Sequence, residues 1–461
     1  MRADNKTSLG FFTGYIKRFG LKRTFKSLWK QVRAGNLIDD HFIIKGICDG
    51  RYAFKGPLTV QIDLTDSCNN DCICCWCNSP LVRKTDRVSN PSSLDRSVVL
   101  RTIDELKDMG VREIIVSGGG EPFIYPHLMD IIRYIKKHKI YCQLYTNFTL
   151  ATQHSIKELV DLRLDRLIVS LWAGTAKTYR LLHPNKEERY FDEIRSKLIY
   201  LSGIKKRKKI PLVRIHNVIN ALNYNELSQM TDFACRVKAD EVSFSVMDSV
   251  AHTTDTLLLN DEQIQVVLNN YGKLNKKVPV YGIEEFIRRI SYKGAVSGNY
   301  DEEVIDETPC YSGWLFARIK ADGNVNPCLK SHRLPVGNIN DRSFREIWNS
   351  SLQQDFRGKA KTLHKSDLYF SIIGNGIQGL SGCSRICDDL TRNIMMHRKI
   401  TLFPTARLMI KIVGLENKLN KLNKKAARLS KICYLITVVI AYSLFLKFFR
   451  LIKKISIFPG E

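Results

Sequence analysis

The chain has 461 residues, 44% of them hydrophobic, so it is long enough for two or three domains with ordinary buried cores. Its net charge is +26, of which residues 1–57 contribute +8 and residues 391–461 contribute +13, leaving +5 for the residues between. An enzyme that acts on nucleic acid gathers basic charge around its substrate groove, so we expect no nucleic-acid partner. Basic charge at the two ends predicts contact with an anionic membrane surface.

Thirteen cysteines are many for this length. The chain opens with Met1-Arg2-Ala3-Asp4 and no apolar segment follows, so we expect a cytoplasmic protein without a secretory signal. A disulfide framework is not expected in that compartment, and clustered cysteines are therefore interpreted as metal ligands.

The N-terminal 57 residues are predicted to be a basic, amphipathic extension. Leu21, Phe25 and Trp29 share one helical face, and Lys22 and Lys26 lie beside it. Basic amphipathic helices with aromatic residues bind membrane interfaces. A helix that packs on the protein with a solvated basic face is the alternative.

A series of short apolar runs and helical stretches extends from residue 58 to 290. The predicted strands are 58–64, 113–116, 141–145, 166–171, 212–218 and 241–246, and the predicted helices are 96–109, 127–137, 156–162, 191–201 and 226–237. Runs without polar alternation are typical of strands that are covered on both faces. The pattern predicts an α/β fold, an incomplete (β/α)6 TIM-like barrel, with its chemistry at the C-terminal ends of the strands.

The first group of cysteines directly follows the first predicted strand. Cys68, Cys72 and Cys75 have the spacing C-x3-C-x2-C. A loop of this kind can wrap three thiolates around three corners of a [4Fe–4S] cubane, which leaves the fourth iron open to a substrate or cofactor. A zinc site that uses Cys72 and Cys75, or Cys74 and Cys77, as a C-x2-C pair is the alternative, although no second pair follows nearby.

A second group of cysteines lies in residues 291–400, where turn residues are dense. Cys310 and Cys328 flank a predicted Asp-Gly turn, so we expect them on paired strands, and Cys383 and Cys387 follow as C-x3-C. Four thiolates from three places in the chain fit one four-ligand iron–sulfur cluster. A four-cysteine zinc ribbon is the alternative.

Residues 401–461 are predicted to form a basic helical stretch that ends in an apolar tail. Residues 432–446 carry no charge, but this run is shorter than the ~20 residues that span a bilayer. Lysine and arginine flank it on both sides, which argues against a simple span. We therefore expect a shallow anchor, with the protein peripheral on the inner face of the membrane.

The cysteine spacing and the motifs described next occur in an order along the chain that resembles the radical S-adenosylmethionine (SAM) superfamily. A Gly-Gly-Gly-Glu turn at 118–121 follows the second predicted strand and is similar to the GGE element of that family. The pattern C-x12-G-x4-C from Cys310 to Cys328, with Gly337-Asn338-Ile339 and Ile347-Trp348-Asn349 after it, resembles the SPASM domain. A full SPASM domain has seven cysteines, so the four here resemble its shortened, single-cluster form, often called twitch.

The resemblance implies two [4Fe–4S] clusters, one catalytic and one auxiliary, and SAM as cofactor. It implies SAM contacts from six residues at the ends of strands two, three and four: Gly118, Gly119, Gly120, Glu121, Asn147 and Ser170. It also implies reductive cleavage of SAM to a 5′-deoxyadenosyl radical, hydrogen abstraction from a substrate, and a low-potential electron donor such as flavodoxin or ferredoxin. The family's aromatic residue before the third cysteine is replaced by Cys74, and Trp76 is the candidate substitute.

No motif in the sequence identifies the substrate. Oxidation of a lipid, a lipid-linked sugar or a small metabolite at the membrane is the favoured hypothesis. Peptide maturation is one alternative, and a membrane-bound iron–sulfur electron carrier without enzymatic activity is another. The candidates for a general base are His183, Asp248, His252 and His332.

Overall fold

The computed structural model describes residues 36–82, 91–205, 209–375 and 382–402. One compact unit spans Gly50–Arg398, whereas helix α3 (Asn36–Asp49) and the residues from Lys399 onward belong to a second unit. The amphipathic segment predicted around Leu21 and the apolar run 432–446 lie outside the described residues. Within the described ranges, no helix is both long enough and apolar enough to cross a membrane.

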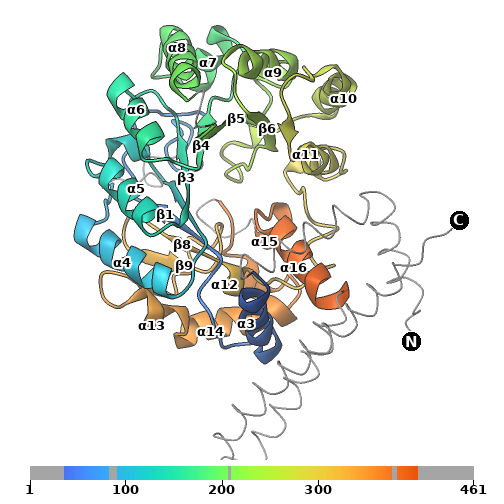
Figure 1. The fold of residues 1–461 in the computed structure, drawn as a ribbon. Coiled ribbons are helices and arrows are strands. Elements are labelled where there is room, and N and C mark those ends of the chain that lie inside the picture. Colours follow the sequence, from blue (N-terminus) through green and yellow to red (C-terminus); the bar gives the residue numbers. More distant parts are fainter. Residues whose placement is uncertain (1–35, 83–90, 206–208, 376–381, 403–461) are drawn as a thin grey trace, which may run out of the picture. The chain divides into compact units, whose positions relative to one another are not determined.

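A ten-stranded sheet forms the centre of the Gly50–Arg398 unit (Figure 1). Seven of its strands are parallel and follow each other in chain order: β1 (Thr59–Asp63), β2 (Glu113–Ser117), β3 (Tyr141–Thr146), β4 (Arg166–Ser170), β5 (Leu212–Ile219), β6 (Glu241–Val246) and β7 (Val280–Tyr281). The predicted α/β fold with a partial TIM-like barrel is confirmed. The short strand β7 was not predicted.

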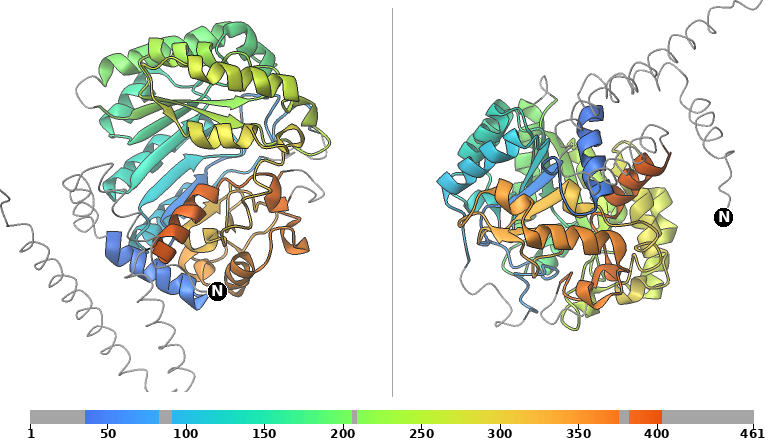
Figure 2. Two further views of the ribbon diagram at one scale, coloured as in Figure 1. Left: turned by 90° about the vertical axis from the view of Figure 1, so that its right-hand side faces the viewer. Right: turned by 90° about the horizontal axis from the view of Figure 1, so that it is seen from below.

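Helices cover the outer face of these parallel strands (Figure 2). They are α4 (Arg96–Asp108), α5 (Leu128–Lys137), α6 (Gln153–Asp161), α7 (Ala176–Leu182), α8 (Arg189–Ile204), α9 (Leu227–Arg236), α10 (Asp261–Asn270) and α11 (Ile283–Ile290). The packing follows from the sequence pattern, because α5 buries Leu128, Ile131 and Ile135 on one face and β4 is fully buried at Leu167 and Val169.

The later part of the chain extends the same sheet past β1. Strand β8 (Phe316–Ile319) pairs in parallel with β1, and β9 (Asn324–Asn326) and β10 (Gly337–Asn338) continue the sheet in antiparallel pairing. The predicted turn at Asp322-Gly323 joins β8 to β9, and Gly323 has the positive φ of 86° that such a turn requires.

The prediction that Cys310 and Cys328 lie on the paired strands is wrong. Helix α12 (Ser312–Leu315) separates Cys310 from β8, and Cys328 follows the end of β9. The Ser312 hydroxyl donates to the Pro327 carbonyl oxygen at 3.1 Å, so the two segments that carry these cysteines are joined beyond the strand ends.

Four helices complete this part of the chain: α13 (Phe344–Trp348), α14 (Ser351–Thr362), α15 (Gly382–Arg385) and α16 (Leu390–Leu402). Arg357 on α14 is fully buried, and its guanidinium donates to the carbonyl oxygens of Gly313 and Trp348 at 2.8 and 2.6 Å. The bond to Gly313 ties α14 to the segment that begins with Cys310, and the bond to Trp348 ties α14 to α13.

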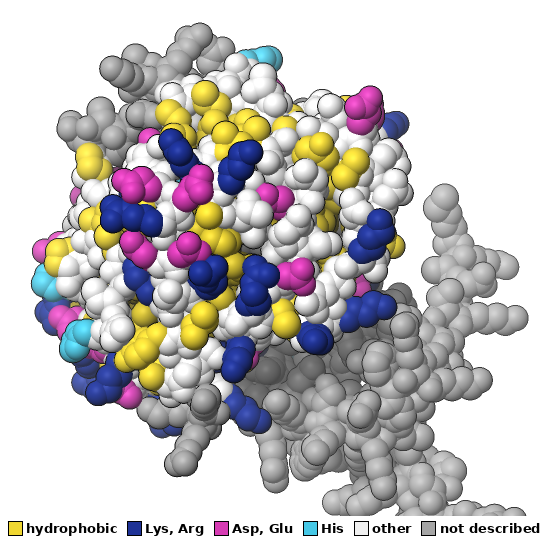
Figure 3. Space-filling model, turned by 90° about the horizontal axis from the view of Figure 1, so that it is seen from above, with side chains coloured by type: hydrophobic (Ala, Val, Ile, Leu, Met, Phe, Trp, Pro, Cys, Tyr) yellow, Lys and Arg dark blue, Asp and Glu magenta, His cyan; other side chains and the backbone are white. Residues whose placement is uncertain are grey.

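The outer face that includes α8 and α9 carries both signs of charge. Lysine and arginine side chains alternate there with aspartate and glutamate side chains (Figure 3). This mixture agrees with the small net charge of the central part of the sequence.

Candidate active site

The loop that follows β1 holds the first three predicted ligands. Backbone hydrogen bonds fold it, including one from the Cys75 amide to the Cys72 carbonyl at 2.9 Å. Two sulfurs accept further amide hydrogens, Cys68 from Asn70 at 3.5 Å and Cys75 from Asn78 at 3.3 Å. Amide donors aimed at sulfur stabilise thiolates, which are the form that binds iron.

The three thiols lie close enough together to affect one another's ionisation. Burial raises the pKa of Cys68 to about 11, and the neighbouring Cys75 adds to that rise. Burial also raises the pKa of Cys72, with contributions from Cys75 and Cys68. Three adjacent thiolates therefore need a positive partner, and an iron–sulfur core supplies one.

The glycine turn after β2 packs directly against this cysteine loop. The Gly120 amide donates to the Thr65 carbonyl at 3.0 Å, and the Glu121 amide donates to the Ser67 carbonyl at 2.8 Å. A Cβ atom at Gly120 would lie 2.0 Å from the Ser67 carbonyl oxygen, and one at Gly119 would lie 2.5 Å from Asp66. The glycines are therefore required for the contact between the two loops.

Glu121 is a buried carboxylate, 2% exposed, in the floor of this site. Its Oε1 accepts hydrogen bonds from the Thr146 hydroxyl at 2.6 Å and the Phe123 amide at 3.1 Å, and its Oε2 accepts one from the Asn147 amide at 2.7 Å. Burial raises the pKa of Glu121 to about 7, against these hydrogen bonds. Among the residues that the structure describes, it has no ion pair, so the site fits an ammonium group.

Asn147 and Ser170 stand at the ends of neighbouring strands. The Asn147 side chain donates to Asn69 Oδ1 in the cysteine loop at 3.0 Å and accepts from the Thr149 amide at 2.9 Å. Asn147 thus links the end of β3 both to Glu121 and to the cysteine loop. Ser170 is the last residue of β4, half-buried beside His216 of β5.

The two additional cysteines of the loop have different surroundings. Cys74 packs in an apolar cluster with Leu182, Met247 and Leu257. The Cys77 sulfur lies 3.6 Å from that of Cys75 and donates to the Gly119 carbonyl oxygen at 3.2 Å. Cys77 therefore joins the cysteine loop to the glycine turn, which its sequence position alone did not indicate.

Trp76 connects the first cysteine loop to the segment after Cys328. Its ring stacks on His332, with centroids 5.0 Å apart, and the Arg318 guanidinium lies 5.4 Å from its centroid. Arg318 also forms a buried ion pair with Asp63 at the end of β1, at 2.6 Å.

The four cysteines of the second group line one cavity. Cys310, Cys328, Cys383 and Cys387 face it together with apolar side chains such as Phe370. Burial raises the pKa of Cys387, and Cys310, Cys383 and Cys328 each add to the rise. The structure thus brings together the four residues that the sequence predicted as one ligand set. Within the described ranges, no three Cys, His, Asp or Glu side chains stand close enough to hold a single metal ion.

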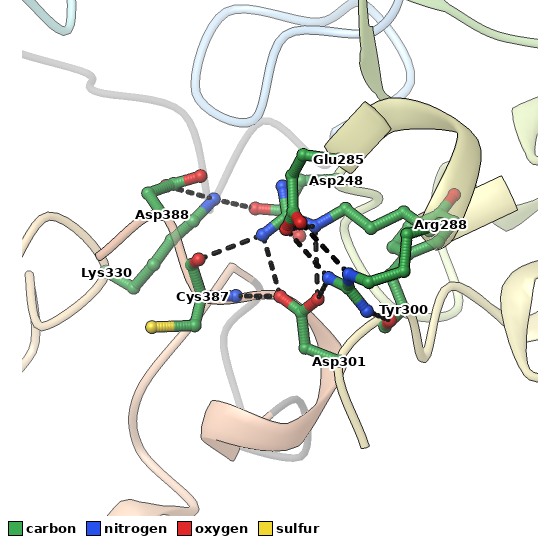
Figure 4. A network of polar contacts seen from close by, with 9 residues as sticks. Asp248, Glu285, Arg288, Tyr300, Asp301, Lys330, Cys387 and Asp388 are labelled. Carbon is green, nitrogen blue, oxygen red and sulfur yellow. Dashed lines mark hydrogen bonds and ion pairs between the residues drawn. The ribbon is translucent and has the colours of Figure 1, made fainter. Parts of the chain in front are cut away.

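A network of charged residues contacts the backbone of Cys387 (Figure 4). The Cys387 amide donates to Asp301 at 2.7 Å, and its carbonyl accepts from Arg289 at 2.9 Å. Lys330 pairs with Asp248 and, at 3.4 Å, with Asp388. Sequence reasoning missed this network because its members come from distant parts of the chain.

The general-base candidates from the sequence do not form one group. His183 is buried, its Nδ1 bonds to the Tyr179 carbonyl at 2.7 Å, and burial lowers its pKa to about 4. Burial also lowers the pKa of His332, to about 3, and its ring stacks on Trp76. His252 is exposed. Asp248 is engaged by Lys330 and by Asn375.

Two family models match the chain. Residues 62–233 match the radical SAM superfamily, and residues 310–368 match SPASM, described as an iron–sulfur cluster-binding domain. The first range includes the three cysteines of the loop, Glu121 and Ser170, and the second includes Cys310 and Cys328.

Known relatives share about a quarter of their aligned residues with this chain. The tungsten-containing aldehyde ferredoxin oxidoreductase cofactor-modifying protein of Pyrococcus furiosus is 24% identical over 65% of this chain and 82% of its own length. The PqqA peptide cyclase of Gluconobacter oxydans is 24% identical over 66% and 79%. The crystal structure of Streptococcus suis SuiB bound to S-adenosylmethionine superposes with a TM-score of 0.53 at 15% identity, covering 83% of this chain and 89% of that chain.

Proposed function

The chain belongs to the radical SAM superfamily and carries a SPASM-type domain, and from this we propose that Cys68, Cys72 and Cys75 hold its catalytic [4Fe–4S] cluster. The enzyme uses SAM and needs an external electron donor. The observation that carries this proposal is that the loop of Cys68, Cys72 and Cys75 packs against the glycine turn. This contact places the three thiols in one site with the buried Glu121, which has no ion pair among the described residues. We assign residues 58–290 to the core and 291–400 to the auxiliary domain.

SAM would be bound on the glycine turn. The backbone could approach SAM closely at Gly118, Gly119 and Gly120, because glycine has no Cβ atom. Glu121 would accept hydrogen bonds from the ammonium group of SAM. Asn147 would fix Glu121 from the end of β3, and Ser170 would contact SAM from β4. When bound, the reduced cluster and SAM supply a 5′-deoxyadenosyl radical, which removes a hydrogen atom from the substrate.

We propose that one auxiliary [4Fe–4S] cluster would be held by Cys310, Cys328, Cys383 and Cys387, and that it would supply an electron acceptor for the substrate radical. All four thiols face the same cavity, so they could occupy all four ligand positions of such a cluster. The net result is oxidation of the substrate.

Removal of the auxiliary cluster should uncouple the enzyme. In the Cys387→Ala variant we expect iron to fall from about 8 to about 4 per chain. Cleavage of SAM should continue, whereas product formation should fall at least about tenfold because the electron has no acceptor. Iron analysis and chromatography of 5′-deoxyadenosine and product measure this. Zinc bound at the four cysteines would contradict the assignment.

For the substrate we retain a lipid, lipid-linked sugar or small metabolite as the first candidate. The names of two relatives, the tungsten cofactor-modifying protein and the AdoMet-dependent heme synthase of Methanosarcina barkeri, support a small molecule. The PqqA peptide cyclase supports a peptide as the second candidate. To separate the two candidates, a lipid fraction and a peptide fraction of the host cell are each incubated with the reduced enzyme and SAM. The substrate belongs to the fraction in which a molecule loses hydrogen.

We also propose peripheral attachment to the inner face of the membrane, with flavodoxin or ferredoxin as the electron donor. The proposal rests on the basic charge of residues 1–57 and 391–461.

The full chain should therefore pellet with vesicles that contain anionic lipid. Each basic residue near the surface contributes ~1 kcal/mol, and added salt should weaken binding by screening. Deletion of residues 401–461 should abolish most of the binding and leave SAM cleavage intact. Binding of the truncated protein as tight as that of the full chain would refute the attachment.

A further inference from the structure

Lys365 lines the cavity that the four auxiliary cysteines share. The residue is 6% exposed, and its ammonium donates to the carbonyl oxygens of Ala360 and Leu363, each at 3.0 Å. The Phe370 ring lies beneath it, with its centroid 5.1 Å away. In the part of the chain that the structure describes, no carboxylate forms an ion pair with Lys365.

Lys330, which also lines this cavity, is paired with carboxylates. Lys330 binds Asp248 and Asp388 (Figure 4). Arg289, which donates to the Cys387 carbonyl oxygen, binds Asp301 through two nitrogens, at 3.1 and 2.8 Å. Lys365 differs from them because its ammonium group donates to neutral carbonyl oxygens, while its backbone amide donates to Asp306 Oδ1 at 2.8 Å.

The Lys365 ammonium lies close to the Cys310 backbone. The Ala360 carbonyl oxygen accepts both from Lys365 Nζ at 3.0 Å and from the Cys310 amide at 3.2 Å, so the two nitrogens are within about 6 Å of each other. Lys365 lines the same cavity as Cys310 and Cys383. The positive charge of Lys365 therefore acts on the sulfurs that face the cavity.

A buried ammonium without an anionic partner is unfavourable, so the cavity should hold an anion. Four thiolates around an iron–sulfur core leave the assembly negatively charged, and reduction adds one more negative charge. We propose that Lys365 is the countercharge of the auxiliary cluster and that it stabilises the reduced form of this cluster. The inference rests on the proposed function and deepens it, because such a cluster accepts electrons more readily from a substrate radical.

A plain structural role for Lys365 is the competing explanation. Ala360 lies in the last turn of α14, and a lysine that caps helix carbonyls stabilises the helix C-terminus. A cap affects the stability of the protein, whereas a countercharge affects the potential of the cluster. The two roles therefore differ in a measurable quantity.

The test uses the full chain with Cys68, Cys72 and Cys75 changed to Ala, reconstituted so that the auxiliary cluster alone remains. EPR-monitored redox titration gives the ratio of reduced to oxidised cluster at a fixed potential. Lys365→Met should lower this ratio at least about tenfold, which is 59 mV for a one-electron couple. Lys365→Arg keeps the charge and should stay within about threefold of the parent. Lys293→Met removes a charge that is 82% exposed and should change nothing measurable.

Each outcome decides the inference. An unchanged ratio in Lys365→Met with a lower melting temperature would show a helix cap only. Loss of the cluster in Lys365→Met and in Lys365→Gln, with retention in Lys365→Arg, would support the countercharge. Loss in Lys365→Arg as well would overturn it, because the position would then require shape and not charge. A parent protein without iron would instead contradict the proposed function.

Discussion

A chain with Cys68, Cys72 and Cys75 all changed to Ala should lose SAM cleavage completely. We expect its iron to fall from about 8 to about 4 per chain, because the second group of cysteines is untouched. The loss should be total because all three proposed ligands of the catalytic cluster are removed. Iron analysis and chromatography of 5′-deoxyadenosine measure both effects.

A Cys74→Ala variant is the matched control for the triple variant. Cys74 lies in the same loop, but it packs against Leu182 and Met247 and is not one of the three proposed cluster ligands. It should retain about 8 iron atoms and SAM cleavage. SAM cleavage by the triple variant would show that the cysteine assignment is wrong.

The Gly120→Ala variant should lose most SAM cleavage although it changes no ligand. Its Cβ would lie 2.0 Å from the Ser67 carbonyl oxygen, so the glycine turn must move away from the cysteine loop. Displacement of reacting groups by about 1 Å costs about 100-fold in rate, and we expect a loss of that size. The strain should also lower stability by about 1–3 kcal/mol. Single-turnover assays and thermal unfolding measure the two effects.

The control for this variant is Gly203→Ala on α8. Nothing lies within 4 Å of a Cβ atom there, and alanine is the better helix former. We expect full activity and a gain of about 0.5–1 kcal/mol in stability. Full activity in Gly120→Ala as well would show that the contact between the two loops does not position SAM.

Much of the core was predictable because its signals are local. Apolar runs such as the one around Ile168 gave strands close to their observed bounds, and the cysteine spacing marked the loop after β1. The second group of cysteines was predicted as one ligand set; the fold brings its four members to one cavity, and their role as ligands stays a prediction.

Contacts between distant residues were not predictable, because each partner lacks a local signature. Arg318 and Asp63 form a buried pair across 255 positions, and Asn147 reaches Asn69 across 78. The position of Cys310 was also mispredicted, since the apolar residues of α12 form a helix where the turn pattern indicated a strand. Lys365 resembles a surface lysine in sequence, and only the fold buries it.

The most direct test of the account is EPR spectroscopy of the reduced Cys387→Ala protein with and without SAM. This variant should retain the cluster of the first cysteine loop alone, with one iron open to SAM. We predict a single cluster signal that shifts on addition of SAM and that 5′-deoxyadenosine forms in the same sample. A signal that SAM leaves unchanged, with no 5′-deoxyadenosine, would contradict the central claim.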